Sequence, residues 1–557
     1  MNIAPEQATT AAGAPDSRNP RLALRRARGS RSAAGLGSGT APGSEGARRS
    51  EAARRGAPGL LVIAALVSAA AAAIPLVYLV VRAAESGLPT IIETLARERV
   101  LEYAANSLGL AAATTATALV LGTAVAFVLT RVRVPFARTW LLISALPLAV
   151  PSYLAGYGWL VVSPGLNGFL PSWLLLTAVT VPYVTLPVAA ALRGASGDLE
   201  GVARTLGRGP LRAFFVATWP SVRPAAIAGS LLVALYALSD FGLVAILRFP
   251  TLTWGINAAY SASFDRAQAA TLALLLVVLA LVVVAGERAA RRQVPRAVAR
   301  AVAPRPVSRR MLLAALPVIA IAPVVGVVVP LLGLLSRLLD AATLREIDVA
   351  RLLGAVGSTV GVAVAAAVLA VLLALPIAAL AARHRGRLMA AIESVGYLGH
   401  ALPGIVVGLS LVFFSLAVVP ALYQSLAVLV FAYAVLFMPK AIGTMRAGLG
   451  DVSPQLVGVA RTLGMSPLQA WWRVTVPLAL PSVGIGALLV AIATMKELPA
   501  TLLLRPTGVQ TLATELWNRT VVFEFGAAAP YAALLVLVAA VPAVILSGVR
   551  SSAKEEL

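Results

Sequence analysis

Four charged residues lie in or beside apolar stretches of this chain, at positions that repeat. Asp240 and Glu497 are 257 residues apart, and the same interval separates Arg248 from Arg505. Counting from Pro224 at the helical rise per residue places Asp240 about 24 Å along a helix, in the outer part of a lipid bilayer. Charged groups at such depth usually face a cavity or a partner. The four residues are therefore predicted to line a path for a charged solute.

A structural interpretation of the same residues also fits. Asp240, Lys496 and Glu497 could lie at helix ends or form salt bridges between helices, and the neighbours Lys496 and Glu497 cannot face each other on one helix. Tyr153 and Tyr236 could add phenolic oxygens to a path, although packing or interfacial positions are their commoner use. Both interpretations are carried forward.

A second repeated feature is the heptapeptide GVARTLG, which occurs at 201–207 and again at 458–464. Each copy is predicted to form a short helix that presents an apolar ridge, Ala203 and Leu206 in the first copy. A glycine in the left-handed conformation would end each helix. The result is a rigid knob suited to a partner's groove. The residues expected to make this contact are Val202, Ala203, Arg204, Leu206, Gly207 and Pro210, with Val459, Ala460, Arg461, Leu463, Gly464 and Pro467.

The interval of 257 residues holds beyond the heptapeptide. It pairs Thr218 with Thr475, Pro220 with Pro477 and Gly229 with Gly486. A match in one register over this length indicates an internal duplication.

The composition places the duplicated unit in a membrane. Hydrophobic residues make up 59% of the 557 residues, charged residues 12%, and the mean hydropathy is +0.88. Spans of about 20 apolar residues cross a bilayer as helices. The sequence predicts twelve of them, near 58–82, 106–130, 139–162, 169–192, 224–247, 265–285, 311–337, 356–382, 391–418, 422–446, 481–504 and 527–549.

Arginine positions indicate how these spans are oriented. Arginines gather in the first 56 residues, at 131–138, at 288–310 and at 383–387. If these segments are cytoplasmic, both termini and both heptapeptides are cytoplasmic too. Six spans per half then give two parallel repeats. We expect a disordered basic tail at 1–57, repeats at 58–286 and 311–550, and a cytoplasmic linker at 287–310.

Several kinds of chemistry are excluded or disfavoured. The chain has no cysteine, which excludes disulfides, iron–sulfur clusters and thiolate metal sites. His384 and His400 are its only histidines, and His400 is interpreted as a polar residue packed in the bundle. No lysine follows a glycine, so a phosphate-binding P-loop is absent. The sequence predicts no cofactor, no enzymatic activity of its own and, despite a net charge of +23, no nucleic-acid partner.

The heptapeptide region resembles the "EAA" coupling loop of permease subunits of bacterial ABC importers. The shared frame is Ala-x-x-x-Gly, a hydrophobic or aromatic pair, and Pro-x-x-x-Pro before the next span. One difference is that the acidic residue of the motif falls at Gly201 and Gly458, with Glu200 one place early and Val457 in its place in the second copy. The resemblance implies a type I ABC importer permease fold and two copies of an ATP-binding subunit at the loops.

The segments around SDFG and KELPATLLLRPTG resemble the iron(III) branch of these permeases, in which both halves form one chain. This implies transport of ferric iron, delivered by a periplasmic binding protein, across a bacterial inner membrane by alternating access. Thiamine, phosphonate, sulfate and polyamine branches share much of the pattern and are the alternative substrates. An ion-coupled secondary transporter, or a structural or receptor membrane protein, would not explain two cytoplasmic docking loops.

Overall fold

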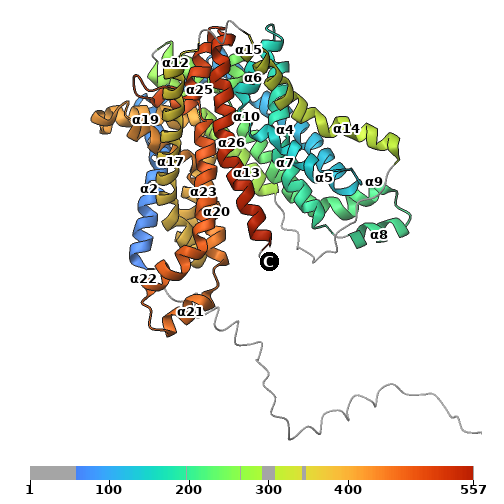
Figure 1. Cartoon of the computed structure of the whole chain (residues 1–557). Helices are drawn as coiled ribbons and strands as arrows, with labels where there is room; N and C mark the ends of the chain where they lie inside the picture. Colours follow the sequence, from blue (N-terminus) through green and yellow to red (C-terminus); the bar gives the residue numbers. More distant parts are fainter. Residues whose placement is uncertain (1–57, 196, 264, 291–307, 341–346, 556–557) are drawn as a thin grey trace, which may run out of the picture. The chain divides into compact units, whose positions relative to one another are not determined.

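The computed structural model describes residues 58–195, 197–263, 265–290, 308–340 and 347–555, where the regular elements are helices (Figure 1). The predicted tail, 1–57, and most of the predicted linker, 287–310, lie outside the described residues. The expectation of an all-α polytopic protein is confirmed. Long apolar runs become helices because only internal hydrogen bonds satisfy the backbone in lipid.

The two halves follow the same order of helices. In the first half these are α2 (Gly59–Glu85), α3 (Leu88–Ala96), α4 (Glu98–Arg131), α5 (Ala137–Ala145), α6 (Ser152–Val162), α7 (Phe169–Arg193), α8 (Gly197–Thr205), α9 (Pro210–Ala213), α10 (Trp219–Ser239), α11 (Gly242–Ile246), α12 (Leu252–Ser261) and α13 (Arg266–Ala290). A π-helical turn, η2 (Phe214–Thr218), joins α9 to α10.

In the second half the helices are α14 (Arg309–Pro323), α15 (Val329–Leu338), α17 (Val349–Arg383), α18 (Arg387–Gly396), α19 (Gly404–Val418), α20 (Leu426–Asp451), α21 (Pro454–Thr462), α22 (Pro467–Ala470), α23 (Val476–Met495), α24 (Pro499–Leu504), α25 (Leu512–Val521) and α26 (Phe525–Glu555). A π-helical turn again precedes the long helix, at η6 (Trp471–Thr475). The duplication in sequence is therefore also a duplication in structure.

Among the described residues, ten helical stretches are long and apolar enough to cross a membrane. The predicted spans 139–162 and 391–418 are different, because each is two helices that meet at a bend of 91° or 104°. Proline is the residue before the second helix of each pair, Pro151 before α6 and Pro403 before α19. A proline has no N–H to continue the preceding helix, so each predicted continuous span is broken. Twelve crossings result only if each bent pair counts as one.

The bundle core of each half is a trio of helices, α4, α7 and α10 in the first and α17, α20 and α23 in the second. A glycine allows close approach within each trio. A Cβ on Gly229 would lie 2.8 Å from the Cα of Val184, and one on Gly486 would lie 3.2 Å from the Cα of Ala441. Small residues that bring backbones together are the usual packing device in membranes.

The first helix of each half packs on the other half. Helix α2 contacts α17, α18 and α19, whereas α14 contacts α4, α5 and α7, and α15 contacts α6. Figure 1 shows α2 beside α17 and α19, with α14 on the opposite flank beside α4, α5 and α7. This exchange ties the two repeats together.

Candidate functional site

Helices α8 and α21, which carry the heptapeptides, lie at the lower end of the bundle in Figure 1, termed here the α8–α21 end. Gly207 ends the first helix with φ +79°, and its N–H donates to the Arg204 carbonyl at 3.0 Å. The Arg208 N–H donates to the Ala203 carbonyl at 3.2 Å, which completes a Schellman motif. The second copy has Gly464 at φ +89° and the bonds Gly464 to Arg461 and Met465 to Ala460, both 3.1 Å. The predicted left-handed glycine ends are confirmed.

The apolar face of these helices differs from the predicted one. Ala203 and Ala460 are buried, so the expected ridge of alanine and leucine is wrong for the alanine. In their place, a leucine, a valine and a second leucine at i, i+3 and i+7 form an exposed stripe. Leu206 is 74% exposed and Leu463 75% exposed. The stripes comprise Leu199 and Val202 on α8 with Leu206 directly after it, and Leu456 and Val459 on α21 with Leu463 directly after it.

The remaining predicted contact residues differ between the copies. Arg204 pairs with Glu200 at 3.2 Å, whereas Arg461 is exposed and has Val457 in the place of that acid. Pro210 begins α9 and Pro467 begins α22. Proline at a first helical position fits because its missing N–H would have no partner there. The two loops thus share a backbone frame but not a charge pattern.

Glu200, which lies one position before the acidic position of the motif in the first loop, contacts the interior of the protein. Glu200 is buried, and its Oε2 accepts a hydrogen bond from the Thr218 hydroxyl at 3.3 Å. Thr475 is the counterpart of Thr218, and its buried hydroxyl has no hydrogen-bond partner in the described part of the chain. Replacement of the glutamate by Val457 explains this difference.

Asp240, predicted to line a path, binds the start of the short helix α11. Its Oδ1 accepts from the backbone N–H of Leu243 at 3.0 Å and of Val244 at 3.4 Å. The Ser152 hydroxyl, from the start of α6, donates to Oδ2. The carboxylate is buried, and it supplies the side-chain oxygen that the first N–H groups of a helix need.

Glu497 does the same for α24 in the second half. Its Oε1 accepts from the Ala500 N–H at 3.0 Å, and its Oε2 accepts from the Thr501 N–H at 3.1 Å and hydroxyl at 2.9 Å. The Tyr433 hydroxyl lies 2.5 Å from that of Thr501. In the described residues neither Asp240 nor Glu497 forms an ion pair. Both repeated carboxylates are therefore helix caps, with their oxygens already bonded.

The two repeated arginines lie in loops and face different neighbours. Arg248 is exposed, has φ +53°, and lies over the Phe523 ring at 5.3 Å. Arg505 donates to the Val509 carbonyl at 3.4 Å and to the Gln510 side chain. The predicted matching of carboxylates with arginines is absent from the ion pairs of the described ranges.

Comparison with known proteins gives the family. A family model described as binding-protein-dependent transport system inner membrane component matches residues 374–550. The chain is 32% identical over 480 residues to the Fe(3+)-transport system permease protein FbpB 2 of Haemophilus influenzae, which covers 85% of this chain and 95% of that protein. The chain belongs to this family.

Other inner-membrane transport components match shorter stretches. The molybdenum transport system permease protein ModB of Mycobacterium bovis is 31% identical over 236 residues, which is 38% of this chain and 87% of that protein. The putrescine transport system permease protein PotI of Escherichia coli is 29% identical over 171 residues, or 29% and 61% of the two chains. The two halves of this inner-membrane transport component are one chain, whereas these relatives match less than half of it.

The sequence interpretation missed polar contacts between the halves of this inner-membrane transport component. The Lys496 ammonium donates to the Leu148 carbonyl at 2.9 Å, and the Tyr153 hydroxyl donates to the Lys496 carbonyl at 3.4 Å. Leu148 and Tyr153 lie on either side of the break in the bent span of the first half, and Lys496 follows α23 of the second. The helix breaks between Leu148 and Ser152, which leaves the Leu148 carbonyl free to accept from Lys496, and the position of such a break could not be predicted from the apolar pattern.

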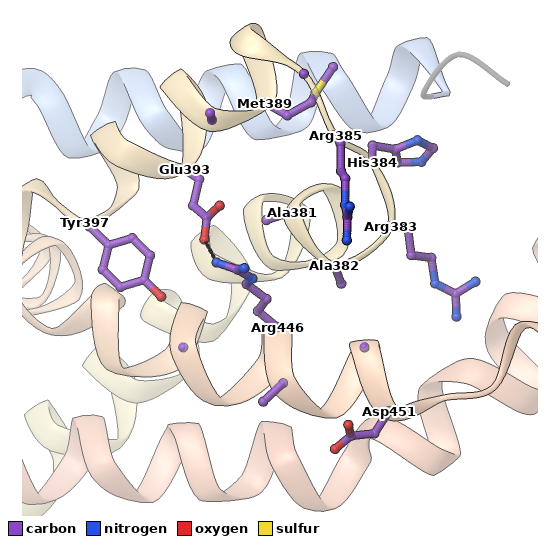
Figure 2. Close-up of a pocket in the computed structure, with 15 residues that line it drawn as sticks. Ala381, Ala382, Arg383, His384, Arg385, Met389, Glu393, Tyr397, Arg446 and Asp451 are labelled. Atoms are coloured by element: carbon purple, nitrogen blue, oxygen red, sulfur yellow. Dashed lines mark hydrogen bonds and ion pairs between the residues drawn. The ribbon is translucent and has the colours of Figure 1, made fainter. Parts of the chain in front are cut away.

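A cavity of about 710 Å³ opens among the ends of α17, α18 and α20 (Figure 2). Figure 2 shows Glu393, Tyr397 and Arg446 on one side and Arg383, His384 and Arg385 on the other; Arg446 is paired with Glu393. Burial, and then the charge of Arg383, lower the pKa of His384. This histidine is half-buried against the cavity, so it is less solvated than a loop histidine.

Proposed function

We propose that the chain is the permease of an ATP-driven importer that moves ferric iron from a periplasmic binding protein to the cytoplasm by alternating access. The observation that carries the proposal is the alignment of 480 residues with an Fe(3+)-transport permease, which spans both halves. The family works with a binding protein, as its description states. The shorter similarities to molybdenum and putrescine permeases make molybdate and a polyamine the alternative substrates for the test.

The proposed orientation puts the α8–α21 end in the cytoplasm, together with both termini. The arginines that follow α4 and α17, among them Arg133 and Arg385, support this orientation through the positive-inside rule. Helices α8 and α21 would then meet soluble cytoplasmic partners. The membrane would be the bacterial inner membrane.

Two copies of an ATP-binding subunit are proposed to dock at the heptapeptides. The exposed stripes on α8 and α21 consist of apolar side chains at helical spacing. A helix that binds in a partner's groove presents such a stripe to the groove. The Schellman ends fix the direction of the chain after each stripe. Closure of the two ATP-binding subunits would draw the loops together, and the halves would rock around the interface between them.

We propose that four residues lie at the outer part of the transport path: Asp240, Arg248, Glu497 and Arg505. The two carboxylates would affect the path indirectly, by stabilising the helices that they cap. Helices α11 and α24 follow directly from α10 and α23, which form part of each bundle core. A cap that holds α11 or α24 would shape the path without offering a free charge to the solute.

Uptake of radioactive iron tests the function. The chain would be produced with its ATP-binding subunit and binding protein in a bacterium that lacks other ferric importers. We expect ⁵⁵Fe uptake to depend on all three proteins. Leu206→Asp with Leu463→Asp should lower uptake at least about tenfold, because a charge would enter an apolar contact. Leu206→Met with Leu463→Met is the matched control and should transport normally.

Uptake of molybdate or a polyamine in place of iron would overturn the ferric assignment and leave the permease assignment standing. Normal uptake by the aspartate variant, inserted at the wild-type level, would overturn the docking of the ATP-binding subunit at these stripes.

A further inference from the structure

The cavity among the ends of α17, α18 and α20 has a basic lining that the proposed transport function does not use. Its volume of about 710 Å³ lies within the range of small-molecule sites. Arg383 at the end of α17, Arg385 in the turn after it and Arg446 on α20 all line it. Figure 2 shows Arg385 and Arg446 directed toward the middle of the cavity from opposite sides. Three guanidinium groups from two segments of the chain therefore surround one space.

The acidic side chains of the lining leave two of these arginines without a partner. Glu393 pairs with Arg446. Asp451, at the end of α20, lies apart from Arg385 and Arg446 in Figure 2. Among the described residues, Asp451, Arg383 and Arg385 occur in no ion pair. Two guanidinium groups thus line the cavity without a carboxylate beside them, which favours an anionic ligand.

A metal ion does not fit this lining. His384 is part of it, but within the described ranges no three His, Asp or Glu side chains lie close enough to hold a metal ion. Burial lowers the pKa of His384, and the charge of Arg383 lowers it further, which indicates a positive potential beside this histidine. His400, predicted to be packed in the bundle, is instead exposed and lies outside the lining. The cavity therefore disfavours a cation.

The arginines after α17 could instead serve only to orient the span, as the positive-inside rule describes. The first half offers a comparison. Helices α4 and α17 end 252 residues apart, at Arg131 and Arg383, so Arg133 corresponds to Arg385. Both halves therefore have the arginines that orientation requires.

The rest of the lining differs between the halves. The interval of 252 residues pairs Glu393 of α18 with Leu141 of α5. The interval of 257 residues, which holds for α7 and α20, pairs Arg446 with Ala189. Leu141 packs in an apolar cluster with Ile319 of α14. Orientation of a span needs arginines but no polar cavity, so the polar lining in the second half points to a ligand.

We propose that this cavity binds the phosphate group of an anionic ligand through Arg383 and Arg385, with Arg446 on the opposite side. Guanidinium groups donate paired, charge-assisted hydrogen bonds to phosphate oxygens. Basic pockets between helices at the cytoplasmic side of a membrane suit the headgroups of anionic lipids. Free phosphate presents the same oxygens.

The site lies next to the second docking loop. Gly450 and Asp451 line the cavity, and α21 begins three residues after Asp451, at Pro454. A bound phosphate group would therefore lie beside the segment that positions α21. The site does not depend on ferric iron as the substrate.

The absence of cysteine from the chain allows occupancy to be measured by protection of single thiols. Ala447→Cys places a thiol in the lining, and Ala390→Cys provides a second such reporter. Ala391→Cys, exposed on α18 but outside the lining, is the matched control. The complete transporter in phosphatidylcholine nanodiscs would be reacted with the uncharged N-ethylmaleimide at constant ionic strength. We expect inorganic phosphate, or replacement of part of the lipid by phosphatidylglycerol, to slow the two lining reporters at least about fivefold and to leave Ala391→Cys unchanged.

The two additions distinguish the sources of the phosphate group. Protection by phosphatidylglycerol alone identifies a lipid headgroup, and protection by inorganic phosphate identifies the free anion. Arg383→Gln with Arg385→Gln should abolish the protection. Arg387→Gln with Arg309→Gln removes two exposed charges outside the lining and should retain it.

Three results would overturn the site. The first is equal reaction rates with and without both additions at both lining reporters. The second is protection that survives the glutamine substitutions at Arg383 and Arg385. The third is protection that needs only the ATP-binding subunit, because a segment of that subunit would then be the occupant. Iron uptake is not measured here, so a failure of the ferric assignment leaves the phosphate site untouched.

Discussion

Thr218 donates its hydroxyl hydrogen to Glu200 at 3.3 Å, and this bond fastens helix α8 to the π-helical turn that leads into α10. The second repeat keeps the threonine, Thr475, but has Val457 where the acid would be. The same position is thus a satisfied polar pair in one repeat and a hydroxyl without a described partner in the other.

This difference predicts that the same substitution has unequal effects on stability in the two repeats. Thr218→Val should lower the thermal midpoint, because it removes about 1 kcal/mol of buried hydrogen bonding from Glu200. Thr475→Val should leave the midpoint unchanged or raise it, since its hydroxyl contributes no bond in the described structure. Fluorescence-detected size exclusion after heating would measure both. An equal fall in the two variants would contradict the assignment.

The glycine ends of α8 and α21 make a prediction about coupling. Valine at Gly207 or Gly464 would have to adopt a left-handed conformation, at a penalty of roughly 1–2 kcal/mol, and the loop would change direction. We expect Gly207→Val with Gly464→Val to insert normally and hydrolyse ATP with its partner, but to import little. Asparagine at both sites is the control, because it tolerates this conformation. Wild-type uptake by the valine variant would refute the role of these ends in coupling.

Two substitutions of Asp240 distinguish a structural role of its carboxylate, as a helix cap, from an electrostatic role in the path. Asparagine keeps an oxygen for the Leu243 and Val244 N–H groups, and its amide can donate to the Ser152 hydroxyl. Asp240→Asn should therefore retain most of the stability and uptake, whereas Asp240→Ala should lose about 1 kcal/mol or more of the cap. Thermal midpoint and ⁵⁵Fe uptake would be compared. A stable Asp240→Asn variant that imports nothing would show that the charge itself serves the path.

The proposed orientation is tested with single cysteines in the cysteine-free chain. Cysteines at Gly209 and Ser466, in the loops after α8 and α21, should both resist an impermeant maleimide applied to intact cells. Ala262→Cys, an exposed position after α12, is the control and should react. Reaction at one heptapeptide loop but not the other would exclude two parallel repeats.

Local sequence patterns correctly predicted the features that depend on residues close together in the chain, namely the ends of the heptapeptide helices and the long apolar helices. The heptapeptide gave short helices with left-handed glycine ends because the bonds of a Schellman motif join residues at most five positions apart. The long apolar runs gave helices because a backbone in lipid must bond within its own segment.

Contacts between distant segments determine the features that could not be predicted from the sequence. The cap role of Asp240 depends on a helix that ends at Ser239 and on Ser152, which is 88 residues away. The apolar periodicity of 139–162 and 391–418 showed enough length for a span but not the break within it. Ala203 looked available in sequence, but the packing of α8 on the following π-helical turn buries it.

The packing of the first helix of each repeat on the other repeat also depends on contacts between distant segments. This packing can be tested at α2. Ala72 of α2 is fully buried, in a cluster with Ala367, Ala370 and Ala374 of α17. Leucine at Ala72 would overpack this contact and should destabilise the protein by about 1–3 kcal/mol. Ala70, two residues away, is exposed, and Ala70→Leu is the matched control that should leave the thermal midpoint unchanged. Equal midpoints for the two leucine variants would mean that α2 does not pack tightly on the second repeat.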